Sequence, residues 1–208
     1  IQHITHEIRT PVTLILAPVE EIMRQKNIPE EIRDDLEVVK RNSERLLDLV
    51  NQILDFTKAE QEAFSSQNTW FDIDDLVEKT VQRFTPAAQQ KGIQLTHDTP
   101  QPIRICTDRE ALTKVLSNLL TNAMKFTKDR ILVSLTENPE AHTATISVED
   151  NGTGIKPTEK EKIFNLFYQS ANKPQLPNKG FGIGLAIVSL LVKRMMGKIE
   201  VESEENRF

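Results

Sequence analysis

The sequence predicts an α+β fold class in which an N-terminal helical hairpin precedes an α/β two-layer sandwich. Two observations lead to this prediction. Apolar residues recur with heptad spacing over the first part of the chain, whereas helix-like and strand-like segments alternate over the rest. A short polar stretch of small residues separates the two patterns. The expected parts are residues 1–63 for the hairpin, 64–72 for a linker and 73–208 for the second domain.

The hairpin consists of two expected amphipathic helices that meet at a turn over residues 27–29. Apolar residues fall on heptad positions of both helices: Ile1, Ile4, Ile8, Ile15, Ile22, Leu36, Val39, Leu46, Val50 and Ile53. One hairpin cannot cover stripes of this width. We therefore expect two copies to pair into a four-helix bundle, which makes the chain a homodimer. The alternative is that the stripes pack against the second domain of the same chain.

The second domain is expected to combine a mixed sheet with helices that cover it. The expected helices are residues 74–90, 108–125, 159–167 and 184–196, and the expected strands are 93–97, 103–106, 130–136, 142–149 and 198–203. Asp108 is the expected N-cap of its helix, because a short carboxylate can accept a backbone N–H there. Asn138 and Pro139 predict a turn between two strands.

Composition excludes some classes of function. The 208 residues carry a net charge of −5 and include one Trp and one Tyr, so we expect no nucleic-acid partner. The single cysteine, Cys106, lies in an apolar run and is expected to be buried. No apolar run approaches the roughly 20 residues that cross a bilayer. Because the chain opens in the middle of a helical pattern, we interpret it as a piece of a longer protein.

His6 is the candidate nucleophile of the first helix. It occupies heptad position f, farthest from the core, where an imidazole is accessible to a reaction partner. Glu7 adjoins it and can orient the ring or accept its proton, and Thr10 lies one helical turn further along. Pro11 leaves the carbonyl of Glu7 without its helical donor, which predicts a kink. Without further context, an exposed helical histidine is most often a solvated surface residue.

Asn118, Asn122 and Lys125 form a polar face on the helix expected at 108–125. The i and i+4 spacing of the two asparagines projects both amides from one side of the helix. Amide oxygens are hard ligands that suit Mg²⁺, and the Lys125 cation one turn further along can neutralise a phosphate. A polar helix face in solvent is the alternative for this segment alone.

Two glycine-rich segments complete the set of candidates. The D-x-G-x-G run at 150–154 follows an expected strand, where a carboxylate can accept a hydrogen bond from a base amine while glycines admit the ring. The G-x-G-x-G run at 180–184 opens the last expected helix, where backbone N–H groups favour phosphate. Taken singly, the first run is compatible with a plain turn and the second is a weak phosphate signal.

Together these segments resemble the histidine kinases. The string Thr5-His6-Glu7-Ile8-Arg9-Thr10-Pro11 is similar to the phosphoacceptor box of that family. Three segments, 118–127, 150–155 and 180–188, occur in the order and spacing of its N, G1 and G2 boxes, and 163–167 resembles its F box. The second domain thereby resembles the ATP-binding domain that histidine kinases share with gyrase, Hsp90 and MutL.

The resemblance implies a role for each candidate residue. Asn122 is expected to coordinate Mg²⁺ with Asn118 in support, and Asp150 is expected to accept a hydrogen bond from the adenine amine. The other residues expected to contact phosphates, base or lid are Lys125, Phe126, Gly152, Gly154, Lys179, Gly180, Gly182 and Gly184. Residues 169–183 are expected to form a mobile lid over ATP.

The resemblance also implies an activity. The expected enzyme is a protein-histidine kinase that autophosphorylates His6 from Mg-ATP and passes the phosphoryl group to an aspartate of a response-regulator receiver domain. Thr10 is expected to position water for dephosphorylation of that regulator. The chain is expected to be a cytoplasmic part of an inner-membrane sensor, and the run after His6 is similar to hybrid sensor kinases of gut Bacteroidetes.

Two other classes of function compete with this interpretation. An ATP-driven clamp would use nucleotide to dimerise, but such relatives carry Glu where Asn118 stands. A non-enzymatic interaction module would have lost the residues of its ATP site, whereas all four motifs of the nucleotide domain are present in this sequence. The sequence also departs from the family pattern, because the turn after Thr127 is short and the end lacks the usual glycine turn and final strand.

Overall fold

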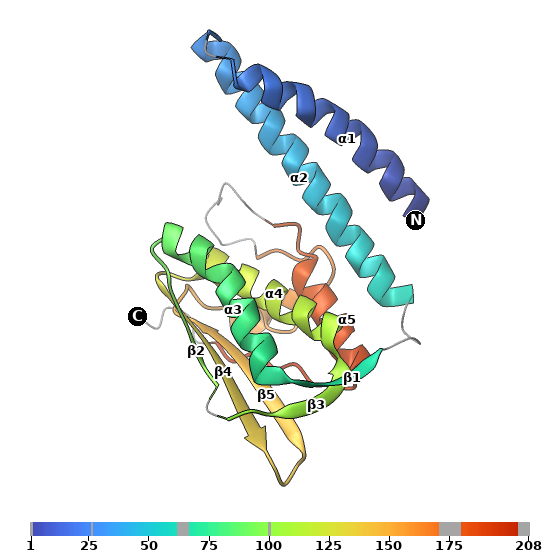
Figure 1. The fold of residues 1–208 in the computed structure, drawn as a ribbon, viewed down its shortest axis with the longest axis vertical. Coiled ribbons are helices and arrows are strands. Elements are labelled where there is room, and N and C mark those ends of the chain that lie inside the picture. The colour runs from blue at the N-terminus through green and yellow to red at the C-terminus, as the bar shows by residue number, and fades with distance from the viewer. Residues whose placement is uncertain (1, 26, 62–66, 100, 171–179, 204–208) are drawn as a thin grey trace. The chain divides into compact units, whose positions relative to one another are not determined.

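The computed structural model describes residues 2–25, 27–61, 67–99, 101–170 and 180–203, and the side chains of residues 2–7 and 61 are outside that description (Figure 1). The chain divides into two compact units, Ile1–Gln61 and Glu62–Phe208. The first unit contains helices only, and the second combines helices with strands. The helical N-terminal region and the α/β domain that follows it confirm the predicted fold class.

The first unit is a hairpin of helices α1 (Gln2–Met23) and α2 (Glu30–Gln61). Its interior contains the buried residues Val12, Val19, Ser43, Val50 and Ala59. Polar contacts also join the helices, because Arg9 Nη2 donates to Asn51 Oδ1 at 2.8 Å and Lys40 pairs with Glu20 at 3.6 Å. α1 continues through Pro11 and Pro18 as one helix.

The hairpin buries only part of its apolar surface. Val12 and Val19 are 4% and 8% exposed, and they repeat at seven-residue spacing along the inside of α1. A second heptad series stays exposed on the two helices: Ile8, Ile15, Ile22, Ile32, Val39 and Leu46. A single hairpin therefore buries one apolar series of each helix and leaves the other series in contact with water.

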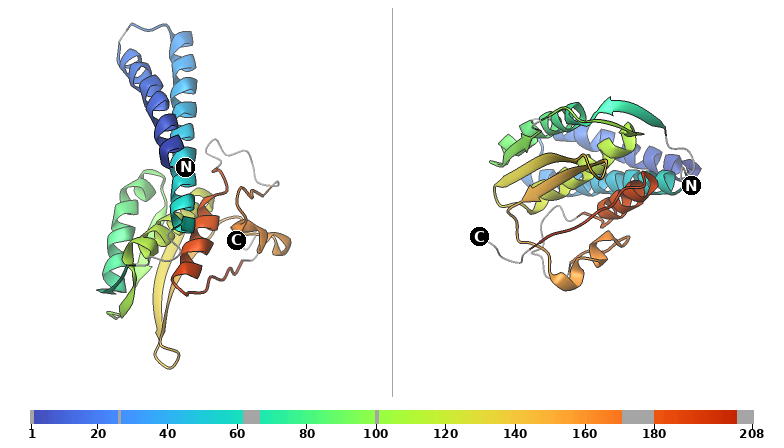
Figure 2. Two further views of the ribbon diagram at one scale, coloured as in Figure 1. Left: turned by 90° about the vertical axis from the view of Figure 1, so that its right-hand side faces the viewer. Right: turned by 90° about the horizontal axis from the view of Figure 1, so that it is seen from below.

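The second unit contains two small sheets. Strands β1 (Asn68–Asp72) and β3 (Arg104–Asp108) form an antiparallel pair. Strands β2 (Gln94–Asp98), β4 (Arg130–Asn138) and β5 (Thr143–Asp150) form the other sheet in the order β2-β4-β5. β2 is parallel to β4, whereas β5 is antiparallel to it, so this sheet is mixed as expected. The hairpin of β4 and β5 extends beyond the helices (Figure 2).

Helices α3 (Ile73–Gln90), α4 (Arg109–Phe126) and α5 (Gly184–Arg194) supply the other layer. α3 and α4 share one hydrophobic core with the sheet, and its fully buried centre includes Val77, Leu116, Leu120, Ile131 and Val133. α5 packs beside α4 through its own buried face, which includes Ala186, Ile187 and Leu191. One side of α4 is therefore committed to the core.

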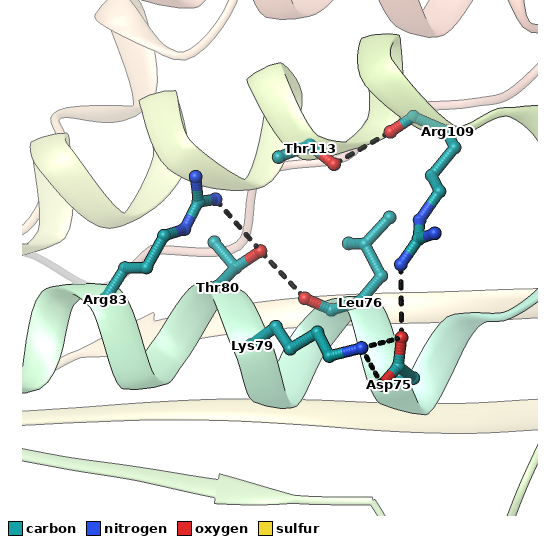
Figure 3. A network of polar contacts seen from close by, with 7 residues as sticks. All are labelled: Asp75, Leu76, Lys79, Thr80, Arg83, Arg109 and Thr113. Carbon is teal, nitrogen blue, oxygen red and sulfur yellow. Dashed lines mark hydrogen bonds and ion pairs between the residues drawn. The ribbon is translucent and has the colours of Figure 1, made fainter.

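Polar contacts fix the start of α4 against its neighbours. The Asp108 carboxylate accepts the Ala111 amide at 2.9 Å, which confirms Asp108 as the N-cap, and it also pairs with Arg194 at the end of α5. Asp75 of α3 accepts from Lys79 of the same helix at 2.7 Å and from Arg109 at the start of α4 at 3.1 Å (Figure 3). The register of α4 relative to α3 and α5 is thus set at its N-terminal end.

Three expected elements differ in the structure. Residues 68–72, placed at the end of the linker, form β1 because Phe71 alternates into the core while Trp70 points outward. The helix expected at 159–167 is replaced by two 3₁₀ helices, Pro157–Glu159 and Lys162–Phe164, which are followed by extended backbone at Asn165 and a positive φ of 63° at Phe167. Residues 198–203 form no strand.

The expectation that Cys106 is buried is wrong. In β3, Ile105 faces inward and Cys106 faces outward, opposite the exposed Trp70 in the register of β1. The apolar run around Cys106 is a strand with one buried face, so alternate residues are exposed. No helix within the described ranges is long and apolar enough to cross a membrane.

Candidate functional site

The second half of α4 has two opposite faces. One face carries the buried residues Leu116, Leu120 and Ala123 of the core. The opposite face carries Asn118, Asn122 and Lys125, which share one side of the helix because they are spaced about one turn apart. All three side chains are half-buried. The helix therefore holds three polar side chains in a partly desolvated row, supported from behind by the core.

Gly184 at the start of α5 lies against the first of these side chains. A methyl group at Gly184 would lie 2.9 Å from Asn118 Oδ1, so the backbone approaches the amide oxygen closely. The Asn118 orientation is fixed, because its Nδ2 donates to the Lys114 carbonyl at 2.9 Å. At the other end of the run, a methyl group at Gly180 would lie 3.0 Å from Lys125 Nζ. The run at 180–184 thus follows the polar face of α4 from Lys125 to Asn118.

The D-x-G-x-G run meets the C-terminal end of the same helix. A methyl group at Gly152 would lie 2.2 Å from the Phe126 carbonyl oxygen, which only glycine permits. The Gly152 amide donates to Asp150 Oδ1 at 2.8 Å, so one carboxylate oxygen is held by the turn that it starts. Gly154 has a φ of 73°, a conformation that favours glycine.

The structure brings three of the sequence-predicted segments together on α4. The residues that lie on α4 or in these two glycine runs are Asn118, Asn122, Lys125, Phe126, Asp150, Gly152, Gly154, Gly180, Gly182 and Gly184. Thr10 is exposed on α1 in the first unit. His6 and Glu7 lie in α1, but their side chains are outside the described part of the chain. Lys179 is also outside it, as are residues 171–179 of the lid expected over 169–183.

Asn151 is an organising residue that the sequence analysis missed. Its Oδ1 accepts from Thr127 Oγ1 at 2.9 Å and from the amides of Arg130 at 3.0 Å and Asp129 at 3.2 Å. Its Nδ2 donates to Asp129 Oδ1 at 2.6 Å. The side chain therefore ties the turn after α4 to the loop after β5, and it makes the short turn after Thr127 well defined. An asparagine beside a turn is the sequence signal for such a role.

Glu159 is a second residue that the sequence analysis missed. Its Oε1 accepts from Tyr168 Oη at 3.0 Å, and its Oε2 accepts from Ser170 Oγ at 3.1 Å. Partial burial of Tyr168, together with this hydrogen bond and the charge of Glu159, raises the pKa of Tyr168 above its ordinary value of 10.0. No motif marks Glu159, because its two partners follow it by nine and eleven residues in irregular backbone.

The arrangement suits a nucleoside polyphosphate. Backbone N–H groups at a glycine-rich helix start and the Lys125 ammonium group favour phosphate. At Gly152 and Gly184 the backbone lies too close to α4 to admit a side chain, so both runs stay against the polar face of that helix. The described residues include no group of three or more His, Cys, Asp and Glu side chains that could hold a metal. Amide oxygens together with phosphate oxygens are donors that can bind Mg²⁺.

Two protein families match the chain. Residues 1–62 match the family described as "His Kinase A (phospho-acceptor) domain". Residues 107–207 match the family described as "Histidine kinase-, DNA gyrase B-, and HSP90-like ATPase". The first match covers the hairpin and the second covers all three segments that meet on α4.

Individual relatives support the same assignment. The chain is 30% identical over 204 residues to the sensor histidine kinase YcbM of Bacillus subtilis, covering 97% of this chain and 66% of YcbM. It is 33% identical over 207 residues to the "Autoinducer 2 sensor kinase/phosphatase LuxQ" of Vibrio vulnificus, covering 96% of this chain and 24% of LuxQ. The crystal structure of full-length ShkA in complex with AMPPNP superposes with a TM-score of 0.75 at 28% identity, over 94% of this chain and 40% of ShkA. The chain thus spans less than two thirds of these relatives.

Proposed function

The chain belongs to the sensor histidine kinases, and from this premise we propose that it transfers the γ-phosphoryl group of ATP to His6. The observation that carries the proposal is the meeting of both glycine runs with Asn118, Lys125 and Phe126 on α4. A phosphoacceptor helix carrying Thr5 to Pro11 precedes this site in the same chain. The proposed enzyme therefore contains both the donor site and the acceptor.

The two glycine runs would bind different parts of the nucleotide. Asp150 Oδ1 accepts the Gly152 amide, which orients the carboxylate so that Oδ2 can accept a hydrogen bond from the adenine amino group. The run at 180–184 would receive the phosphates at the N-terminus of α5, where Lys125 adds a positive charge. The AMPPNP complex of the related ShkA supports a triphosphate as the ligand.

Asn122 is the proposed Mg²⁺ ligand of the chain, and Asn118 supports it from one turn before. Both side chains are half-buried on the same face of α4, where an amide oxygen can bind a hard cation without adding negative charge beside phosphates. When bound, Mg²⁺ would neutralise charge on the phosphate oxygens. Lys125 would share that task at the end of the same face.

The transfer itself needs little covalent chemistry from the nucleotide site. An imidazole nitrogen of His6 forms a bond to the γ-phosphorus while the bond from that phosphorus to the bridging oxygen breaks and ADP leaves. The attacking nitrogen is the unprotonated one, and the proton on the other ring nitrogen passes to Glu7, which also orients the ring. Positioning and charge neutralisation supply most of the rate enhancement in reactions of this type.

A response-regulator receiver domain is the proposed acceptor of the second transfer, through an aspartate. Thr10 is exposed on α1, one helical turn beyond His6, where its hydroxyl can hold a water molecule beside a docked regulator. The related LuxQ is named a sensor kinase/phosphatase, which supports a regulator-dephosphorylating activity here. Regulator dephosphorylation that is unchanged in Thr10→Ala would contradict this role.

The exposed heptad series supports a homodimer of the hairpin. Ile8, Ile15 and Ile22 on α1 and Val39 and Leu46 on α2 remain exposed in a single copy. Pairing two copies into a four-helix bundle would bury both series and remove their contact with water. We further place this core in the cytoplasm, where ATP is available, as part of a longer inner-membrane sensor.

Incubation with γ-labelled ATP and Mg²⁺ tests the proposal, with wild type, His6→Gln and Asn122→Ala compared side by side. Wild type should acquire a label that is lost in acid and kept in alkali, as a phosphorus–nitrogen bond requires. His6→Gln should remain unlabelled while still binding ATP, and Asn122→Ala should lose most of the Mg²⁺-dependent label. Label on His6→Gln would overturn the assignment of the acceptor.

A further inference from the structure

One carboxylate outside the proposed nucleotide-binding set holds two hydroxyl groups at once. Glu159 is half-buried at the end of a 3₁₀ helix, and each of its oxygens accepts one hydrogen bond, from Tyr168 and from Ser170. Hydrogen bonds to a charged acceptor are stronger than those between neutral groups. A single carboxylate therefore holds the side chains of both Tyr168 and Ser170.

The segment that carries these two side chains is bonded directly to the second glycine run. The Phe167 amide donates to the Gly182 carbonyl at 2.9 Å, and Gln169 Nε2 donates to the Gly180 carbonyl at 2.8 Å. These two bonds alternate along the segment with the two hydroxyls that Glu159 holds. Each residue from 167 to 170 thus contacts either Glu159 or a glycine of the run.

The contact between the two segments is close and conformationally demanding. Phe167 has a φ of 63° and Gly182 has a φ of 74°, and a methyl group at Gly182 would lie 2.5 Å from the Tyr168 carbonyl oxygen. A left-handed conformation costs a residue with a side chain about 1 kcal/mol or more. The surrounding contacts have to offset that cost, and Glu159 supplies two of them.

We propose that Glu159 is a positioning residue for the phosphate end of the nucleotide site. Through Tyr168 and Ser170 it holds the segment that is bonded to Gly180 and Gly182, and Gly180 in turn borders Lys125. The inference rests on the proposed function, since it assigns the run at 180–184 to phosphate. Glu159 itself does not touch the nucleotide in this proposal.

Comparing two ligands separates this role from a general loss of structure. Glu159→Ala should weaken binding of ATP about tenfold, on the scale of one charge-assisted hydrogen bond, while adenosine affinity stays unchanged. Adenosine lacks phosphates and reports only the base pocket around Asp150. Calorimetric titration with ATP and displacement of a fluorescent ATP analogue by adenosine give the two affinities in the full chain.

Matched variants sharpen the comparison. Glu161→Ala removes an exposed carboxylate two residues further along and should change neither affinity. Glu159→Gln keeps one acceptor oxygen and offers an amide donor to the other hydroxyl, so it should remain within about threefold of wild type. Tyr168→Phe combined with Ser170→Ala should weaken ATP as much as Glu159→Ala, and the triple variant should be no worse, because all act on one set of contacts.

The outcomes distinguish this inference from the proposed function. A wild-type chain that binds neither ATP nor adenosine would refute the nucleotide site itself. A wild type that binds ATP, with Glu159→Ala weakening ATP and adenosine equally or weakening neither, would overturn only the positioning role of Glu159. Additive losses in the triple variant would also contradict it.

Discussion

At the scale of single residues, the space around a glycine distinguishes two kinds of position. Some glycines only allow the chain to turn, whereas others are also required because a neighbouring segment lies too close for a side chain. Gly92 and Gly182 both have positive φ, of 68° and 74°. A methyl group at Gly92 would meet nothing within 4 Å, whereas at Gly182 it would meet the Tyr168 backbone. Both positions disfavour a side chain through strain, but only Gly182 also lacks the room for one.

Exchanging each of these glycines for alanine should therefore have different consequences. Gly92→Ala should lower the free energy of unfolding by about 1 kcal/mol through strain alone and leave ATP affinity unchanged. Gly182→Ala should in addition displace the run at 180–184 and weaken ATP by at least about tenfold, which is roughly 1.4 kcal/mol. Denaturant unfolding and ATP titration measure the two effects, and equal ATP affinities in the two variants would contradict the argument.

Tyr168 provides a spectroscopic test of its contact with Glu159, because it is the single tyrosine of the chain. Its pKa lies above 10.0, through partial burial first and Glu159 second, so the native state favours the neutral phenol. The associated stabilisation is present below pH 10 and is lost as the pH rises through the native pKa. Ultraviolet titration should give a midpoint above that of urea-unfolded protein, and Glu159→Ala should lower it partway. An unchanged midpoint in Glu159→Ala would argue against the contact.

The residues proposed to carry the chemistry can be identified in the sequence, whereas the residues that position them cannot. Asn118, Lys125 and Asp150 stand out in their motifs because few residue types can bind a phosphate, its metal ion or a base amine. Asn151 and Glu159 are ordinary polar residues in sequence, and their roles depend on partners in separate turns and loops. Such roles become visible only when the backbone course is known.

At the scale of elements, α4 joins the core to the site, and its N-terminal end is the best anchored part. Asp108 accepts the Ala111 amide and pairs with Arg194 of α5, and the side chains of this ion pair are about nine-tenths buried. The cap fixes where α4 begins, and the ion pair fixes α5 beside it. Both helices then present their site residues in a defined register.

Substitutions of Asp108 should resolve these two contributions. Asp108→Asn keeps an acceptor for Ala111 but removes the carboxylate that pairs with the buried guanidinium of Arg194, which should cost about 3 kcal/mol of unfolding free energy. Asp108→Ala should cost about 1 kcal/mol more, because it removes the cap as well. Urea unfolding of the second unit, followed by circular dichroism, measures both losses. Equal losses would show that the cap contributes nothing here.

The long elements were predicted within a few residues, because apolar periodicity over 8 to 20 residues leaves little choice. The expected helix at 74–90 is Ile73–Gln90 in the structure, and that at 108–125 is Arg109–Phe126. The predictions of short elements failed where tertiary contacts determine the backbone conformation. Asn68–Asp72 becomes a strand through pairing with β3, and 159–167 lacks the helix because Phe167 turns toward Gly182.

At the scale of the whole molecule, the two units differ in how much apolar surface they leave exposed. The second unit has a closed core between helices and sheet, whereas the hairpin keeps a heptad series exposed. The hairpin is therefore the unit from which association of two copies is expected.

Charge substitutions on α1 test where the copies meet. Ile15→Glu places a carboxylate in the exposed heptad series and should convert the dimer to a monomer at micromolar concentration. Leu14→Glu is the matched control, because Leu14 is 69% exposed against 49% for Ile15 and lies 100° around the helix. Sedimentation velocity should find Leu14→Glu dimeric. A dimeric Ile15→Glu, or a monomeric Leu14→Glu, would place the interface elsewhere.

The meeting of three segments on α4 also determines the order in which the two units of a newly made chain can be completed. The hairpin forms from consecutive helices, so it is complete once residue 61 has left the ribosome. The nucleotide site needs Asn118 and Gly184 together, which requires nearly the whole of the second unit to be synthesised and folded. A nascent chain would therefore carry the proposed phosphorylation site before it completes the proposed nucleotide site.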